Sequence, residues 1–131
     1  MKLLILHCRE FGFELNKKGK LAEDPGVGSA KSEDCVVAMV CVEKGDSLEK
    51  VPAAAKEIAS IADSVASKNI VIFPFAHLSN ELAGPEAAKG VLKGIYDALP
   101  QYSRVWVPFG WFKIWRLESM GHSLASNFRS I

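Results

Sequence analysis

Hydrophobic and polar positions change period along the chain, and each period predicts an element of secondary structure. The apolar run over 3–6 and the alternation of apolar with polar residues over 11–16 predict two strands that form an N-terminal hairpin. Turn and loop formers occupy all of 23–34, which predicts a loop. The continuous apolar run over 35–42 then predicts a central strand.

Two later segments carry apolar residues at helical spacing. Ser47 is a suitable N-cap for a helix over 48–67, whose buried stripe is rich in alanine and lets the helix lie close to a sheet. A second helix begins at Pro85, with Glu86 favourable at its positive N-terminal end, and it ends before Pro100.

The remaining segments complete a sheet. An apolar run over 70–75 predicts a third strand, 104–108 and 112–117 predict two more, and the polar segment 122–131 predicts a short helix or a tail. The order of strands, helix, strand, helix and strands predicts one α/β domain over 1–131, with a mixed or antiparallel sheet and two packed helices.

Composition and charge restrict the class of protein. A chain of 131 residues fits one domain and leaves little room for a second. Its 16 basic and 15 acidic residues give a formal net charge of +1. This balance argues against a protein that coats nucleic acid by neutralising phosphates, and equally against a polybasic membrane-surface module.

The N-terminal segment and the three cysteines predict a cytoplasmic protein. The apolar run before His7 is too short for a signal sequence or a membrane span. Cys35 and Cys41, if they share a strand, lie on one face but about 20 Å apart, too far for a disulfide or a shared metal. No CxxC spacing occurs, so we expect reduced cysteines in the core, Cys8 included, and no structural zinc.

The first candidate site follows the strand over 70–75. Ligand sites favour the carboxyl ends of strands in α/β sheets, and His77 is the titratable group of this turn. A histidine there exchanges a proton near neutral pH or orients a substrate hydroxyl. The alternative is that His77 caps the loop.

The second candidate site is the segment 108–115. Half of the aromatic residues, with all three tryptophans among them, fall between 102 and 115. Gly110 in that company permits a bulge or a close backbone approach by a ligand, and the ammonium of Lys113 is expected to be partly desolvated there, with a lowered pKa. The alternative is a half-buried hairpin from which Lys113 reaches the solvent.

Other features favour structural roles. Gly26-Val27-Gly28 lacks the context of a dinucleotide-binding loop and is interpreted as a flexible turn. The segment 17–20, Lys-Lys-Gly-Lys, is interpreted as a hairpin tip in solvent that could touch a phosphate. His7 and His122 have no partner motif, and no serine has the surroundings of a catalytic nucleophile.

The two candidate segments together resemble a known family. Phe-Ala-His-Leu-Ser at 75–79, Pro-Phe-Gly-Trp-Phe-Lys at 108–113 and Gly-His at 121–122 closely resemble the N-terminal editing domain of archaeal threonyl-tRNA synthetases. Leu-Leu-Ile-Leu-His at 3–7 and Val-Glu-Lys at 42–44 match as well, so that the resemblance covers essentially the whole chain in order.

The resemblance implies the fold of the D-aminoacyl-tRNA deacylases and the hydrolysis of mischarged L-seryl-tRNA(Thr), with threonyl-tRNA(Thr) left intact. Serine lacks one methyl group of threonine, and a missing methylene provides a synthetic site with only ~1–3 kcal/mol of discrimination. A second sieve is therefore needed. The implied partners are the acceptor end of tRNA(Thr) carrying serine, a second copy of the chain as a homodimer, and the rest of a synthetase in cis or in trans; the editing reaction uses no cofactor and no metal.

The resemblance also implies the site residues. Lys113 positions the aminoacyl group or the water, and His77 holds the water or the ribose. Water attacks the ester carbonyl with no covalent enzyme intermediate, assisted by the 2′-hydroxyl of the terminal adenosine. The pocket is lined by side chains and backbone groups of Val42, Pro74, Phe75, Ala76, Phe109, Gly110, Trp111 and Phe112.

Two departures from the family pattern keep other functions open. Phe112 stands where the family commonly has tyrosine, and Ser126 aligns with a usual glutamate, for which Glu118 is a candidate substitute. The alternatives are a D-aminoacyl-tRNA deacylase on the same fold and a catalytically silent tRNA-binding or dimerisation domain. The first is disfavoured because the S-Q-F-type and G-P-type signatures of that family are absent.

Overall fold

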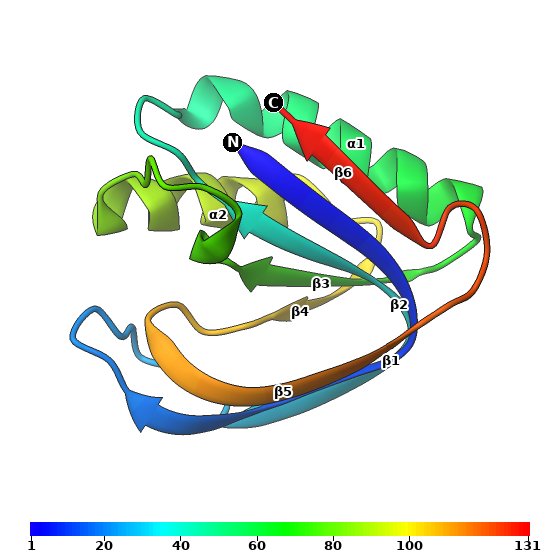
Figure 1. Cartoon of the computed structure of the whole chain (residues 1–131), viewed down its shortest axis with the longest axis horizontal. Coiled ribbons are helices and arrows are strands. Elements are labelled where there is room, and N and C mark those ends of the chain that lie inside the picture. Colours follow the sequence, from blue (N-terminus) through cyan, green and yellow to red (C-terminus); the bar gives the residue numbers. More distant parts are fainter.

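Six strands and two helices make up the chain, and the computed structural model describes all of residues 1–131 (Figure 1). The elements are β1 (Lys2–Lys18), β2 (Ser29–Cys41), the 3-10 turn η1 (Leu48–Lys50), α1 (Val51–Ser64), β3 (Asn69–Pro74), the 3-10 turn η2 (Ala76–Leu78), α2 (Pro85–Asp97), β4 (Ser103–Trp106), β5 (Trp111–Ser119) and β6 (Ser126–Ser130).

The strands form one mixed sheet, as predicted. Its order is β4-β3-β2-β1-β5, and β6 pairs with the first residues of β1. β1 is antiparallel to β2, β5 and β6, whereas β3 is parallel to both β2 and β4. The parallel pairs are the ones that α1 and α2 connect, which places both helices on the same face of the sheet (Figure 1).

Residues 2–18 form one long strand, so the predicted hairpin within them is wrong. A register shift between Cys8 and Glu10, where β1 pairs with β5, marks a bulge. Before it Leu3 and Ile5 lie in the core under the helices, and after it Phe11 lies in the core of the opposite face. An extra residue in a strand reverses which positions face each side, and this reversal imitates the start of a second strand.

Two other expectations are wrong because pairing with β1 overrides local composition. The predicted loop over 23–34 ends at residue 28, since 29–34 continue β2 and pair with β1 between Cys8 and Glu14. The segment 122–131, expected to be a helix or a tail, contains β6, whose residues pair with β1 from Lys2 to Leu6. Both stretches are mostly polar. Their backbone groups form hydrogen bonds with β1, and one face of each stretch is exposed to solvent, so these strands do not need an apolar sequence.

The helices follow the predicted pattern with small differences at their ends. Ser47 caps the turn η1 and accepts a hydrogen bond from the Glu49 amide, so the α-helical bonding begins only at Val51. The first helix ends at Ser64, before Ala66 with its positive φ of 55°. The second helix begins at Pro85, as expected from its fixed φ. No helix is long and apolar enough to cross a membrane.

The core lies on both faces of the sheet. A cluster of 21 buried residues fills the space between the sheet and the helices, and a second cluster of nine lies on the opposite face. Phe73 of β3 and Trp115 of β5 belong to strands separated by two others, yet their rings meet edge to face at 5.3 Å. The sheet is therefore strongly curled, and its curled face is the wall of the site described below (Figure 1).

All three cysteines are free and buried. Cys35 and Cys41 share β2, as predicted, and Cys8 of β1 lies opposite Cys35 in the antiparallel register.

Candidate active site

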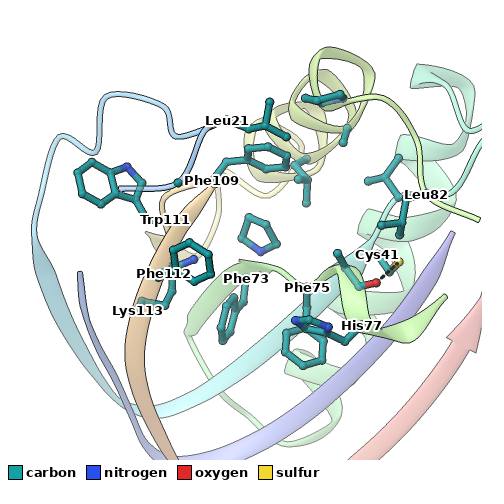
Figure 2. Close-up of a pocket in the computed structure, with 18 of the residues that line it drawn as sticks. Leu21, Cys41, Phe73, Phe75, His77, Leu82, Phe109, Trp111, Phe112 and Lys113 are labelled. Atoms are coloured by element: carbon teal, nitrogen blue, oxygen red, sulfur yellow. Dashed lines mark hydrogen bonds between the residues drawn. The ribbon is translucent and has the colours of Figure 1, made fainter. Parts of the chain in front are cut away.

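A cavity of about 860 Å³ opens at the end of the curled sheet (Figure 2). That volume lies within the range of small-molecule and cofactor sites. All ten residues expected at the site line this one cavity, although they come from three separate parts of the chain: Val42, Pro74, Phe75, Ala76, His77, Phe109, Gly110, Trp111, Phe112 and Lys113.

One wall is the end of β3 and the turn η2. The Phe75 amide donates a hydrogen bond to the Val40 carbonyl at 2.9 Å, which extends the sheet past Pro74. The hydroxyl of Ser79 donates to Glu43 Oε1 at 2.7 Å and ties the end of the turn to the segment after β2. The turn therefore holds the exposed imidazole of His77 at the cavity edge, 5.1 Å from the Phe75 ring centroid.

The opposite wall is the turn between β4 and β5, and Gly110 gives it its shape. Gly110 has φ of 79°, and a Cβ atom there would lie 2.5 Å from the Leu21 carbonyl oxygen. A Cβ atom on Gly19 would lie 2.3 Å from the Gly110 carbonyl oxygen. Backbone thus packs directly on backbone, and neither position has room for a side chain.

Glu23 holds this second wall in place, and the sequence analysis missed it. Its Oε1 accepts hydrogen bonds from Trp106 Nε1 at 2.6 Å and from the Phe109 amide at 2.7 Å. Its backbone carbonyl accepts one from Trp111 Nε1 at 2.8 Å, and its amide donates to the Phe109 carbonyl at 3.1 Å. These four bonds connect the segment after β1 to the turn nearly ninety positions later, so no local pattern could reveal them.

Lys113 is the polar side chain most enclosed by the aromatic wall. In β5 the residues Trp111, Lys113 and Trp115 line the cavity, and Figure 2 shows the first two of them on this strand. The ammonium lies 5.6 Å from the centroid of the Phe73 ring and has no hydrogen bond or ion pair in the structure. Burial lowers the pKa of Lys113, and the charge of Glu23 partly opposes that shift. The ammonium is therefore free to bind an oxygen atom of a ligand.

Phe112 contributes to the rim instead of the interior. Its side chain is 63% exposed, although it borders the cavity. It precedes Lys113 in the strand and so points to the other side.

The thiol of Cys41 is the only thiol on the cavity lining, and no side-chain hydroxyl lines the cavity. The Cys41 thiol donates a weak hydrogen bond to the Ala76 carbonyl at 3.7 Å. Burial raises the pKa of Cys41, which keeps the thiol protonated at neutral pH. The lining thus offers groups that orient a substrate and a water molecule, and it offers no activated thiol or hydroxyl nucleophile.

Several polar residues considered in the sequence lie elsewhere. His7 and His122 contact each other, with 2.7 Å between Nδ1 of His7 and Nε2 of His122, and His7 Nε2 lies 2.8 Å from Asp34 Oδ1. Ser126 opposes Leu6 in the sheet. Neither these residues nor any carboxylate lines the cavity.

Glu118, considered as a substitute for the glutamate that aligns with Ser126, does not line the cavity. It forms an ion pair with Arg9 at 3.1 Å on the exposed surface. No group of three or more His, Cys, Asp or Glu side chains converges in a way that could hold a metal ion.

The comparisons with known proteins agree over the whole chain. Residues 1–131 match the family described as the archaea-specific editing domain of threonyl-tRNA synthetase. The chain is 38% identical over 135 residues to a threonine–tRNA ligase of Methanococcus maripaludis strain C7 and 38% identical over 139 residues to that of Methanopyrus kandleri. A threonine–tRNA ligase of Methanocaldococcus jannaschii is 36% identical over 138 residues. Each match covers 100% of this chain and 22% of the relative, so the chain spans about a fifth of the length of these curated relatives.

Proposed function

Because the chain belongs to the archaea-specific editing domains of threonyl-tRNA synthetase, we propose that it hydrolyses L-seryl-tRNA(Thr) and leaves threonyl-tRNA(Thr) intact. The observation that carries the proposal is the meeting of the 75–79 and 108–113 motifs in one cavity, with Lys113 and His77 on its lining. That arrangement suits the recognition of an ester that joins a small polar amino acid to a nucleoside.

The selectivity for serine over threonine would come from the part of the cavity that small residues line. Val42 is buried, and Ala76 and Gly110 add no side-chain atoms that could move aside. A rigid wall of this kind excludes the extra methyl group of threonine by steric conflict, whereas a synthetic site gains only ~1–3 kcal/mol from its presence. The strongly restrained turn around Gly110 supports such a wall, because the sieve works only if it cannot expand.

The reaction we propose is direct attack of water on the ester. The water oxygen bonds to the acyl carbon, the bond from that carbon to the ribose oxygen breaks, and the ribose oxygen leaves with a proton. The Lys113 ammonium binds the aminoacyl group or the water, and His77 holds the water or the ribose. The 2′-hydroxyl of the terminal adenosine assists, and no covalent enzyme intermediate forms. The protonated thiol of Cys41 is consistent with that route.

The partners that follow are the serylated acceptor end of tRNA(Thr), the remainder of a threonyl-tRNA synthetase, and a second copy of the chain in a homodimer. We propose that editing uses no cofactor and that the protein works in the cytoplasm.

The decisive experiment measures release of amino acid from Ser-tRNA(Thr) and Thr-tRNA(Thr) by the purified 131-residue chain. We expect serine to be released at least a hundredfold faster than threonine. Equal release of both would refute the sieve, and turnover of D-aminoacyl esters instead would identify a D-aminoacyl-tRNA deacylase. Binding of seryl-adenosine with no turnover would identify a silent binding domain, which is the function that Phe112 and Ser126 in place of tyrosine and glutamate would favour.

A further inference from the structure

The cavity concentrates positive charge that the whole-chain balance conceals. Four lysines line it, Lys17, Lys18, Lys20 and Lys113, and no aspartate or glutamate does. The chain as a whole has a net charge of +1, with 16 basic and 15 acidic residues. A cleft lined by one sign of charge focuses the field on an approaching anion more than the net charge indicates.

Three of these lysines form a group at the mouth of the cavity, which we name the lysine ledge: Lys17, Lys18 and Lys20. All three are exposed, and none forms an ion pair. Some other surface cations are matched, as in the pairs Lys50–Asp46 at 2.6 Å and Lys93–Asp97 at 2.6 Å, whereas the exposed Lys31, Lys56 and Lys68 are unpaired but lie outside the cavity. The ledge therefore has charge available for a ligand that the protein itself does not neutralise.

The ledge has a fixed position relative to the aromatic wall. Lys17 and Lys18 pair with Phe112 and Trp111 at the end of the β1–β5 ladder. Gly19, between the lysines, packs on the backbone of Gly110 with no space for a side chain. The ammonium groups thus project from a backbone that is joined directly to the strand carrying Lys113, so they are not at the tip of a free loop.

We propose that the lysine ledge binds the backbone phosphates of the nucleotides that precede the ester-bearing adenosine. The inference rests on the proposed function, because it assumes that the terminal nucleoside occupies the cavity. A single-stranded 3′ end then has to leave through the mouth, and its phosphodiesters are the anions nearest the opening. Lysine binds phosphate as a mobile point charge, which suits a flexible strand and carries no base specificity.

The test compares substrates that share the ester and differ in phosphates. Seryl-adenosine has none, and a 5′-phosphorylated trinucleotide that ends in seryl-adenosine has three. For a single strand, log K falls with log salt by about 0.7 per neutralised phosphate, so three contacts predict about a 20-fold loss of kcat/KM between 50 and 200 mM salt. We expect that loss for the trinucleotide and almost none for seryl-adenosine.

The variant K17A/K18A/K20A should abolish the salt dependence of the trinucleotide reaction and raise its KM at least tenfold at 50 mM salt, with kcat changed less than twofold. The control K31A/K56A/K68A removes the same charge from exposed lysines that do not line the cavity. If the control lowers kcat/KM as much as the ledge variant, the effect is one of net charge and the ledge is refuted. A wild-type trinucleotide reaction as insensitive to salt as that of seryl-adenosine refutes it as well.

A direct binding measurement separates this proposal from the proposed function. The 5′-phosphorylated trinucleotide without the seryl group is titrated against the tryptophan fluorescence of the cavity, to which Trp111 and Trp115 contribute. Tenfold weaker binding to the ledge variant than to the control supports the ledge even if no serylated substrate is hydrolysed. Equal binding by both variants overturns it even if editing is confirmed.

Discussion

Replacement of Lys113 by methionine should separate catalysis from stability. The ammonium is half-buried beside the Phe73 ring, 5.6 Å from its centroid, with no hydrogen bond or ion pair. Burial lowers the pKa of Lys113, which means that the folded protein disfavours the charged form relative to water. The native fold therefore bears a free-energy cost for a charge that packing does not require.

The size of the effect follows from what methionine keeps and what it removes. Its unbranched stem retains the contacts beside Phe73. The lost cation–aromatic attraction of about 0.5–1 kcal/mol is offset by a sulfur–aromatic contact of about 0.3–1.5 kcal/mol. The remaining difference is the desolvation cost of the ammonium, which the variant does not bear. Its removal stabilises the folded variant by about 1 kcal/mol. For a domain of this length that amounts to a melting temperature raised by about 3–5 °C.

Activity should change in the opposite direction. An oriented cationic donor that meets developing charge is worth about 100- to 1000-fold in kcat, so serine release from Ser-tRNA(Thr) should fall by that factor. Circular dichroism melts and single-turnover serine release measure the two effects, and Lys68→Met, an exposed lysine outside the cavity, is the matched control. A variant that melts several degrees lower, or one that keeps a third of the wild-type rate, contradicts the reasoning.

Three further outcomes are expected elsewhere in the fold. Gly110→Ala should lower both the melting temperature and serine release, because its Cβ would lie 2.5 Å from a facing backbone carbonyl oxygen and its φ of 79° costs about 1–2 kcal/mol with a side chain. Burial raises the pKa of Cys8 to about 12 and that of Cys35 to about 11, so a thiol reagent at pH 8 should modify them only after unfolding. The unfolded chain releases these protons from about pH 9 while the folded chain keeps them, so urea melts should show stability falling from pH 8 to pH 10. Tyr102→Phe should cost about 1–2 kcal/mol in thermal melts, because its hydroxyl donates to Asp63 at 2.6 Å, with serine release unchanged since neither residue lines the cavity.

The fold was predictable where one segment carries its own signal. The helices beginning near Ser47 and at Pro85 and the strand over 70–75 follow from periodicity and caps, and the structure confirms them. The wrong predictions concern segments whose secondary structure is determined by pairing with a distant strand. The bulge between Cys8 and Glu10 changes which side chains are buried without ending the strand, and only the partner strand β5 reveals it.

The family resemblance implied ten site residues, and all ten line one cavity, but the sequence does not show how that cavity is built. The two motifs meet because each lies next to the end of a strand in one curled sheet, and strand ends can be located from sequence. The contacts that shape the wall join Gly19 to Gly110 and Glu23 to Phe109, pairs separated by about two thirds of the chain. Such contacts depend on how far the β1–β2 hairpin extends, and the polar residues 29–34 concealed that length.

The distribution of charge is compatible with the nucleic-acid substrate that we propose, although the net charge of the chain is close to zero. Basic residues outside the cavity are often paired with carboxylates, as in Arg129–Glu57 at 2.9 Å and Lys89–Glu86 at 3.0 Å. Such pairs present little field to a duplex, so they gain little from phosphate contacts along it. The lysines at the cavity are not paired, and they act over the short distance that a salt-screened field reaches, about 8–10 Å. Under the proposed function, this distribution of charge favours contacts with the single-stranded end of the substrate over contacts with its duplex part.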